Sequence, residues 1–368
     1  MCHSLVGSEM CIRDRENVDA TSLAQEIKGS TYEGISPKDL AESMLMTART
    51  LVEKEPNYSY VTARLLLNNL ENEVSSFLGF ERRADRAAMY KEALVKTIDK
   101  GIEVGFLSEE LKTFDLERLG SAIKEERDFQ FTYLGLQTLY DRYFITFEET
   151  RYEMPQVFLM RVAMGLAIQE KDKNDRAEEF YNLLSSFDYM SSTPTLFNSG
   201  TNRPQLSSCY LTTVPDDLSG IYGAIRDNAL LSKWAGGLGN DWTNVRALGS
   251  RIKGTNGKSQ GIVPFLKVSN DTAVAVNQGG KRKGAFCAYL ECWHLDVEEF
   301  LDLRKNTGDD RRRTHDMNTA NWVPDLFMKR LESDSNWTLF SPSDVPELHD
   351  IYGSEFEKRY EEYEKMAA

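Results

Sequence analysis

The stretch Ser191-Ser-Thr-Pro-Thr-Leu-Phe-Asn-Ser-Gly-Thr-Asn-Arg-Pro-Gln-Leu-Ser-Ser-Cys209-Tyr-Leu organises the interpretation of the whole chain. Pro194 and Pro204 each lack a backbone donor and push the preceding residue toward extended geometry, so we expect a loop here rather than a helix. The loop offers hydroxyls and backbone N–H groups, and a single thiol follows it. This combination suits a hydroxylated, anionic ligand held beside a redox-active sulfur. The alternative, which composition alone favours, is a Ser/Thr-rich turn before an ordinary buried cysteine.

Length and composition narrow the class of protein. A chain of 368 residues is long enough for two or three domains. The net charge of -14 argues against a general nucleic-acid binder, which needs a basic face. Five cysteines without paired spacing are typical of a reducing compartment, so we expect a cytoplasmic protein. No apolar run approaches the roughly 18 residues that cross a bilayer, so no membrane partner is expected.

Two segments of the opening stretch and four segments further along the chain share one order with a known family. They are Ser192-Thr-Pro-Thr-Leu-Phe-Asn, Gln205-Leu-Ser-Ser-Cys-Tyr-Leu, Gly236-Gly-Leu-Gly, Arg246-Ala-Leu-Gly-Ser-Arg-Ile-Lys-Gly, Asn277-Gln-Gly-Gly-Lys-Arg-Lys-Gly-Ala and Trp293-His-Leu-Asp. Together they resemble the large, catalytic subunit of class I ribonucleotide reductase, strongly from about Tyr140 onward and more weakly from Glu33 to about Leu70. Several long segments in one order are more specific than any single short motif.

The resemblance implies an α/β fold in which a helical N-terminal region, with a partial ATP cone, precedes the first part of a ten-stranded α/β barrel. Residues 1–15 fit no helical or strand period and resemble a non-native leader. We expect partial ATP-cone-like helices over 16–80 and a helical N-terminal domain over 81–190. Residues 191–368 are expected to form a truncated α/β barrel that carries the effector and substrate loops.

Local patterns predict individual elements. Ser36 and Pro37 indicate a helix start, with a capping serine and a proline in the first turn. Helical patterns cover Tyr60–Phe77, Pro155–Glu170, Asp175–Met190, Asp216–Ala235, Pro264–Val276 and Ser354–Ala368. Strands are predicted near Thr243–Leu248 and over Gly284–Cys292, and Asp296-Val-Glu-Glu299 is expected to be a capping box. The alternation of strands and helices independently predicts an α/β layer or barrel.

The resemblance also implies radical chemistry on a ribonucleoside diphosphate. A cysteine thiyl abstracts the 3′ hydrogen, the 2′ hydroxyl leaves as water, and a cysteine pair supplies two electrons and becomes a disulfide. Cys209 matches one member of that reducing pair, and Thr193, Ser208 and Gly237 match positions that contact the substrate. The radical cysteine is expected beyond Ala368, so we expect the chain alone to be inactive.

A second set of residues matches the family's specificity site for deoxynucleoside triphosphates. Asp216, followed by Asp217 and Leu218, is expected to accept a hydrogen bond from the effector ribose. Arg246 and Lys253 are expected to pair with the triphosphate, although Lys253 stands where some relatives carry arginine. For any one of these residues alone, a solvated basic loop is the more economical interpretation.

Three glycine-containing segments invite comparison with nucleotide-binding loops. Gln278 and Arg282 match the mobile loop between effector and substrate, where flanking glycines allow a change of shape; without the resemblance, a surface turn is the default. Gly257-Lys258-Ser259 lacks the earlier glycine of a Walker loop, and Gly237-Leu-Gly239 lacks the last glycine of a Rossmann fingerprint. Neither standard nucleotide-binding fold is therefore expected.

Cys287, Cys292 and His294 invite comparison with a zinc site. On a strand, Cys292 and His294 share a face and Cys287 lies on the other, and no fourth ligand is near. We therefore expect no metal site.

The resemblance implies several partners and no covalently bound cofactor. Deoxynucleoside triphosphates or ATP are expected as effectors, thioredoxin or glutaredoxin as the reductant, and a metal-containing small subunit as the source of the radical. A homodimer is also expected. Two alternatives stay open: the adenosylcobalamin-dependent branch of the same superfamily, and a non-catalytic nucleotide-binding regulator.

Overall fold

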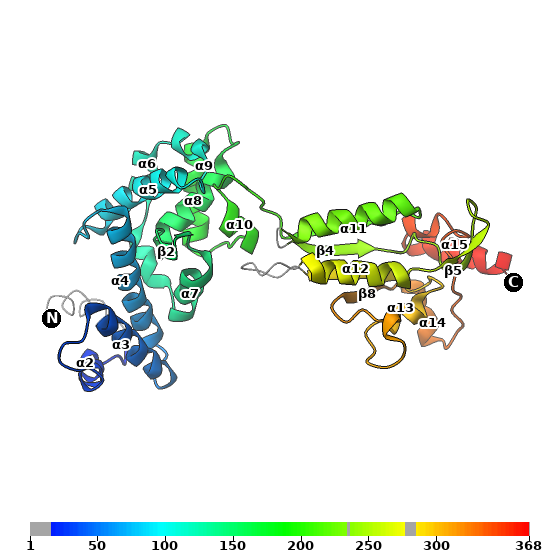
Figure 1. Cartoon of the computed structure of the whole chain (residues 1–368), viewed down its shortest axis with the longest axis horizontal. Helices are drawn as coiled ribbons and strands as arrows, with labels where there is room; N and C mark the ends of the chain where they lie inside the picture. The colour runs from blue at the N-terminus through cyan, green and yellow to red at the C-terminus, as the bar shows by residue number, and fades with distance from the viewer. Residues whose placement is uncertain (1–15, 234–235, 277–284, 368) are drawn as a thin grey trace. The chain divides into compact units, whose positions relative to one another are not determined.

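A computed structural model of the chain describes residues 16–233, 236–276 and 285–367. The chain divides into two compact units, Met1–Leu206 and Ser207–Ala368 (Figure 1). The proposed leader, residues 1–15, lies outside the described residues. Within the described ranges, no helix is both long and apolar enough to cross a lipid bilayer.

The first unit is almost entirely helical. Ser36 caps its second described helix, because its hydroxyl oxygen accepts a hydrogen bond from the Asp39 N–H at 3.1 Å. The elements are α2 (Ala20–Gly29), α3 (Pro37–Thr50), α4 (Tyr58–Leu78), α5 (Arg86–Glu103), α6 (Leu116–Ala122), α7 (Tyr133–Thr138), the short hairpin β1 (Thr146–Phe147) and β2 (Thr150–Arg151), α8 (Pro155–Ala167), α9 (Lys173–Ser185) and α10 (Thr193–Asn198). The predicted helix starting at Ser36 and the three helices predicted after it are confirmed, with shifted ends.

The centre of the first unit is α8, which is buried on nearly every side. Arg161 of this helix forms a fully buried ion pair with Glu153, at 2.6 Å between Nε and Oε1. The same guanidinium donates to the backbone carbonyl of Ser199 at 2.7 Å, just beyond the end of α10. A buried charge is therefore used to hold the segment that follows α10.

The expectation of an uninterrupted loop from Ser191 to Cys209 is wrong, because α10 occupies part of it. Pro194 lies in the first turn of that helix, where the missing N–H has no intrahelical partner to lose and the fixed φ suits the helix. The helix ends at Asn198, and the chain through Pro204 is irregular.

The second unit contains a four-stranded parallel sheet with strand order β3-β4-β7-β8. Its strands are β3 (Cys209–Thr213), β4 (Gly237–Asp241), β7 (Ala285–Glu291) and β8 (Asn318–Trp322). Helices α11 (Leu218–Ser232) and α12 (Val263–Val276) pack on each other and contact β4 and β7 (Figure 1). The remaining elements are the antiparallel hairpin β5 (Leu248–Ile252) and β6 (Gly257–Gln260), α13 (Val297–Leu301), α14 (Asp325–Glu332), a short turn at Leu348–Asp350, and α15 (Gly353–Ala367). A helical region followed by a parallel sheet agrees with the α/β prediction.

Two local predictions in this unit are wrong. Residues 243–247 form no strand, and Leu248 is the first residue of β5. The strand that precedes this segment is β4, which contains glycine. A Cβ atom at Gly239 would lie 2.7 Å from Leu211 Cδ2 on the adjacent strand, so a larger residue there would displace the exposed Leu211 side chain. The capping box is also wrong, because the Asp296 side chain makes no bond to the start of α13. The C-terminal helix is confirmed, with Phe356, Tyr360 and Tyr363 buried.

Candidate functional site

Cys209 is the first residue of β3, and its side chain is exposed. It lies opposite Gly237 in the parallel register, and the Gly237 N–H donates to the Ser208 carbonyl at 2.8 Å. The Ser208 hydroxyl lies 3.7 Å from the Cys209 sulfur. A Cβ atom at Gly237 would lie 3.5 Å from that sulfur, so the glycine leaves room beside the thiol. The structure thus brings three of the predicted site residues together, and the thiol is not buried.

Thr193 lies in the first unit, at the start of α10. Its hydroxyl oxygen is 3.0 Å from the Tyr143 hydroxyl, within hydrogen-bonding distance. The Tyr143 ring stacks on Phe197 of the same helix, with centroids 4.6 Å apart. The threonine hydroxyl is therefore positioned by α10 and by the aromatic residue that packs on it.

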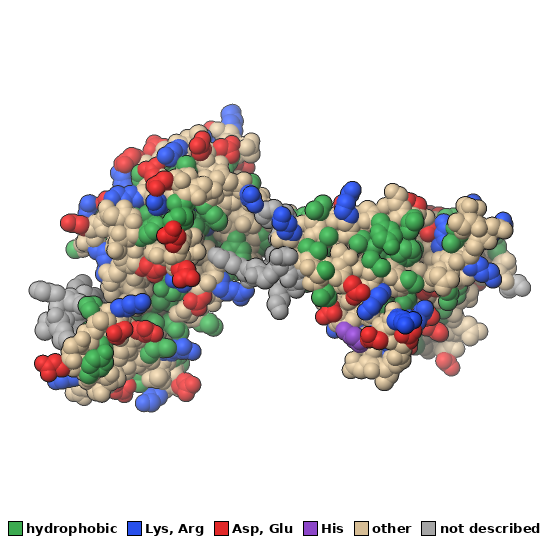
Figure 2. All heavy atoms as spheres, viewed as in Figure 1, with side chains coloured by type: hydrophobic (Ala, Val, Ile, Leu, Met, Phe, Trp, Pro, Cys, Tyr) green, Lys and Arg blue, Asp and Glu red, His purple; other side chains and the backbone are tan. Residues whose placement is uncertain are grey.

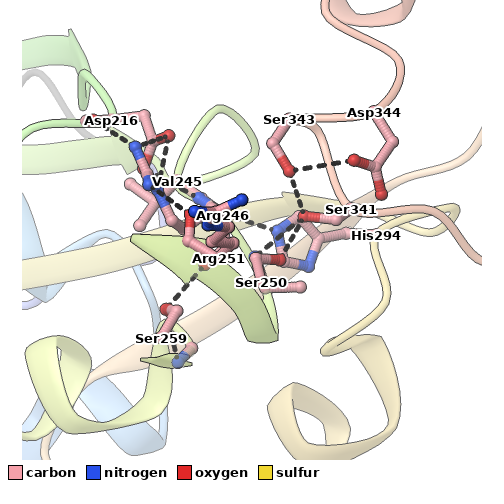
Figure 3. A network of polar contacts seen from close by, with 12 residues as sticks. Asp216, Val245, Arg246, Ser250, Arg251, Ser259, His294, Ser341, Ser343 and Asp344 are labelled. Carbon is pink, nitrogen blue, oxygen red and sulfur yellow. Dashed lines mark hydrogen bonds and ion pairs between the residues drawn. The ribbon is translucent and has the colours of Figure 1, made fainter. Parts of the chain in front are cut away.

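Arg246 and Asp216 form a close ion pair in the second unit (Figure 3). The Arg246 Nε donates to both carboxylate oxygens, at 3.0 and 2.9 Å, and its backbone N–H donates to Oδ1 at 3.0 Å. The hydrogen bond to Asp216 raises the pKa of Arg246. Both side chains are partly exposed, so a triphosphate that binds Arg246 would share this guanidinium with Asp216.

The other predicted effector residues have different settings. Asp217 caps α11, where its carboxylate accepts from the Gly220 N–H at 2.8 Å, and Leu218 is the exposed first residue of that helix. Lys253 is exposed in the turn of the β5–β6 hairpin. Gln278 and Arg282 lie outside the described residues.

A cavity of about 780 Å³ lies at the carboxyl ends of the parallel strands. Its lining includes the last residue of each strand: Thr213, Asp241, Glu291 and Trp322. Ligands of parallel α/β sheets commonly bind at this edge. Cys209 begins β3 and does not line the cavity, but Leu211, two residues further along the same face of that strand, does.

A charged cluster closes one side of the cavity. His349 Nε2 lies 3.0 Å from Asp241 Oδ2, and its Nδ1 contacts Glu291. The hydrogen bonds with Asp241 and Glu291 raise the pKa of His349 to about 10, so the imidazolium persists at neutral pH. Burial alone would raise the pKa of Asp241, but the hydrogen bonds from His349 and Thr243 outweigh it and lower that pKa. Sequence analysis missed this cluster, because nothing local marks the three residues as neighbours.

Comparison with known proteins identifies the family. One family model, described as the ribonucleotide reductase all-alpha domain, matches residues 129–204, and another, described as its barrel domain, matches residues 207–368. The chain belongs to the ribonucleotide reductase large-subunit family.

Relatives from distant organisms carry consistent names. The chain is 56% identical over 356 residues to the ribonucleoside-diphosphate reductase subunit alpha of Chlamydia muridarum. It is 46% identical over 353 residues to the subunit of that name in Helicobacter pylori, and 41% identical over 357 residues to the ribonucleoside-diphosphate reductase large subunit of Arabidopsis thaliana. These matches cover 96%, 95% and 95% of this chain, and 34%, 43% and 42% of the respective relatives. The chain therefore spans less than half the length of these ribonucleotide reductase subunits.

Within this ribonucleotide reductase chain, two further thiols differ from Cys209 in their surroundings. Burial raises the pKa of the partly buried Cys287, and burial with the nearby Glu291 raises the pKa of Cys292 to about 12. Both thiols are thus less acidic than usual, which disfavours the reactive thiolate. Across the described ranges, no group of three or more His, Cys, Asp or Glu side chains has a metal-binding arrangement.

Proposed function

We propose that the chain forms part of the catalytic subunit of a ribonucleoside-diphosphate reductase, an oxidoreductase that makes deoxyribonucleotides for DNA synthesis. The observation that carries this proposal is the exposed Cys209 thiol beside Ser208 and Gly237, in a chain of this family. The names of the relatives do not favour the cobalamin-dependent branch or a non-catalytic regulator.

In the proposed reaction, Cys209 is one of two thiols that reduce the ribose. The 2′ hydroxyl leaves as water, and the thiol pair gives up two electrons and two protons as it closes to a disulfide. A serine in place of Cys209 could not form that disulfide bond. Thr193, Ser208 and Gly237 would contact the substrate, the first through its hydroxyl and the last by leaving space for the ribose. Thioredoxin or glutaredoxin would reopen the disulfide, and a metal-containing small subunit would supply the radical.

The regulatory part of the proposal concerns the second unit. A deoxynucleoside triphosphate would bind to Asp216, Asp217, Leu218, Arg246 and Lys253. Gln278 and Arg282 would respond from the neighbouring loop.

Helices within residues 16–80 would correspond to part of an ATP cone, and the parallel sheet to part of a ten-stranded barrel. Free cysteines at the described positions suit the reducing cytoplasm that we propose as the location.

A homodimer is part of the proposal because α11 and α12 carry exposed apolar side chains. Figure 2 shows hydrophobic side chains gathered over these helices. Those contributed by α11 are Leu218, Tyr222 and Leu230, and those contributed by α12 are Val268 and Val274. An apolar surface of this kind is typical of an interface rather than of a solvated helix pair.

The redox role is tested by Cys209→Ser in a chimaera that continues this chain with the remaining part of the Chlamydia muridarum subunit. We expect loss of multiple turnover with thioredoxin as reductant, while thermal stability and effector affinity stay unchanged. Cys287→Ser, on the same sheet, is the matched control and should keep turnover. Sustained deoxynucleotide formation by the Cys209→Ser chimaera would remove Cys209 from the reducing pair.

The effector role is tested by calorimetric titration of this chain with dTTP or dATP. Arg246→Ala should weaken binding by about 1.5–3 kcal/mol, the range for a lost charged hydrogen bond. Arg251→Ala, an exposed neighbour on β5, is the matched control. Because the proposed dimer face adjoins the effector residues, oligomeric state is measured in the same samples. Equal affinities for wild type and Arg246→Ala would exclude Arg246 from the site.

A further inference from the structure

The segment Trp293-His-Leu-Asp296 has no part in the proposed chemistry, yet it makes an unusual set of buried contacts. The Asp296 carboxylate is 4% exposed and accepts two backbone N–H bonds from distant parts of the chain. Oδ1 accepts from Leu248 N–H at 2.9 Å, and Oδ2 accepts from Ile262 N–H at 3.0 Å. Leu248 begins β5 and Ile262 lies just after β6, so one carboxylate joins both ends of the hairpin.

His294 extends this arrangement to the residue before Arg246. The imidazole is fully buried, and burial lowers its pKa, which favours the neutral ring. Nδ1 accepts from the Asp296 N–H at 3.0 Å, so Nε2 carries the proton and donates to the Val245 carbonyl at 2.9 Å (Figure 3). The tautomer is thus fixed by its two partners, and the backbone at residue 245 is held directly.

The backbone at the base of the β5–β6 hairpin, called the hairpin root below, packs closely against Asp296. Gly261 has φ +73, and a Cβ atom there would collide with the Asp296 carboxylate and lie 3.0 Å from Leu248 N. Ser341 holds the same root from another side, accepting from the Ala247 N–H at 3.2 Å. Backbone groups between Val245 and Ile262 are therefore fixed to buried side chains outside the hairpin.

We propose that His294 and Asp296 are positioning residues, which set the backbone that presents Arg246 and the β5–β6 hairpin that presents Lys253 to the effector. This inference rests on the proposed effector site, because it assigns no contact with nucleotide to either residue. It accounts for a buried carboxylate and a buried imidazole that serve neither the thiol chemistry nor a metal.

The first test is Asp296→Asn in this chain. Its amide nitrogen would face a backbone N–H, so one of the two bonds to the hairpin root must be lost. We expect dTTP affinity to fall about tenfold or more, in line with the loss of a hydrogen bond to a charged group. The amide hydrogens of Leu248 and Ile262 should exchange with solvent faster than in the unaltered chain, as measured by NMR. Tryptophan fluorescence is used first to confirm that the second unit of the variant is folded. Asp296→Glu, which displaces the carboxylate by one methylene, is used if Asp296→Asn does not fold.

Three further variants separate positioning from general stability. Met317→Ala removes a buried side chain just before β8 and should lower stability without changing dTTP affinity. His294→Gln keeps one acceptor and one donor and should retain more affinity than His294→Ala, which keeps neither.

The outcomes distinguish this inference from the effector proposal. If the unaltered chain does not bind dTTP or dATP, the effector proposal fails, and amide exchange alone decides whether Asp296 holds the hairpin. Wild-type dTTP affinity in a folded Asp296→Asn variant, or unchanged exchange at both amides, overturns the positioning role.

Discussion

Replacing Arg161 by methionine should destabilise the first unit by about 3–5 kcal/mol, the range for removing one partner of a buried ion pair. The guanidinium is fully buried and contacts Glu153 through Nε at 2.6 Å and through a terminal nitrogen at 3.3 Å. It also donates to the carbonyls of Ser199 at 2.7 Å and Leu196 at 3.3 Å. Without it, Glu153 keeps one donor, the Ile145 N–H at 3.1 Å, and its charge has no counter-ion.

The double variant Glu153→Leu with Arg161→Met separates charge from packing. Removing both charges together avoids the uncompensated carboxylate, so we expect it to be less destabilised than Arg161→Met alone. The stability that the double variant still loses measures the cost of leaving the Ser199 and Leu196 carbonyls without their donor. That cost is about 1–3 kcal/mol for each buried acceptor without a partner.

The positions of the tryptophans make the assay selective. All five lie in the second unit, at positions 234, 242, 293, 322 and 337. Urea unfolding followed by far-ultraviolet circular dichroism reports helix loss in both units, most of it from the first, while tryptophan fluorescence reports the second unit alone. Arg161→Met should shift the dichroism transition and leave the fluorescence transition in place. A loss below about 1 kcal/mol, or a double variant as unstable as the sum of the single variants, would refute the reasoning.

Other predictions concern single contacts. The folded-state pKa of His349 is raised to about 10, so its contribution to stability is complete below its ordinary value of 6.5 and disappears as pH rises toward 10; thermal unfolding followed by fluorescence should show this fall, and His349→Gln should remove it. Gly165→Ala should cost about 1–3 kcal/mol by dichroism, because its Cβ would lie 2.6 Å from the backbone carbonyl carbon of Ser199; equal stability would show that α8 and the segment after α10 can separate freely. Asp217→Ala should cost about 1 kcal/mol in the second unit through the lost cap of α11, and Asp217→Ser should restore most of it.

Local chemistry explains which elements sequence analysis could predict. Ser36 and Pro37 begin a helix because the cap and the fixed φ act within one turn. Asp296 was assigned wrongly from an equally local pattern, since its carboxylate bonds to distant backbone groups instead. The strand containing Gly239 was missed because glycine does not favour strands by itself; pairing with β3 and β7 on either side makes this segment a strand. Local propensity is overridden where a tertiary contact is stronger.

The residues of the candidate site also fall into those that sequence analysis predicted and those that it missed. Cys209, Ser208 and Gly237 were grouped from a resemblance, and two of them are adjacent in sequence, so their proximity needed only one strand pairing. The cavity cluster of His349 and Asp241 depends on a turn meeting a strand end far earlier in the chain. Such contacts leave no periodicity in the sequence, so no pattern predicted them.

The way the β5–β6 hairpin is closed at its base has a consequence for protein engineering. Its tip, residues 253–256, is exposed, whereas its two ends meet at one buried carboxylate. Lengthening a loop whose ends are already fixed costs little conformational entropy, roughly 0.6 kcal/mol for each doubling. Insertions at the tip, such as a short peptide tag or a fluorophore attachment sequence, should therefore leave the rest of the unit folded, and the hairpin offers a place to install a reporter beside the proposed effector residues.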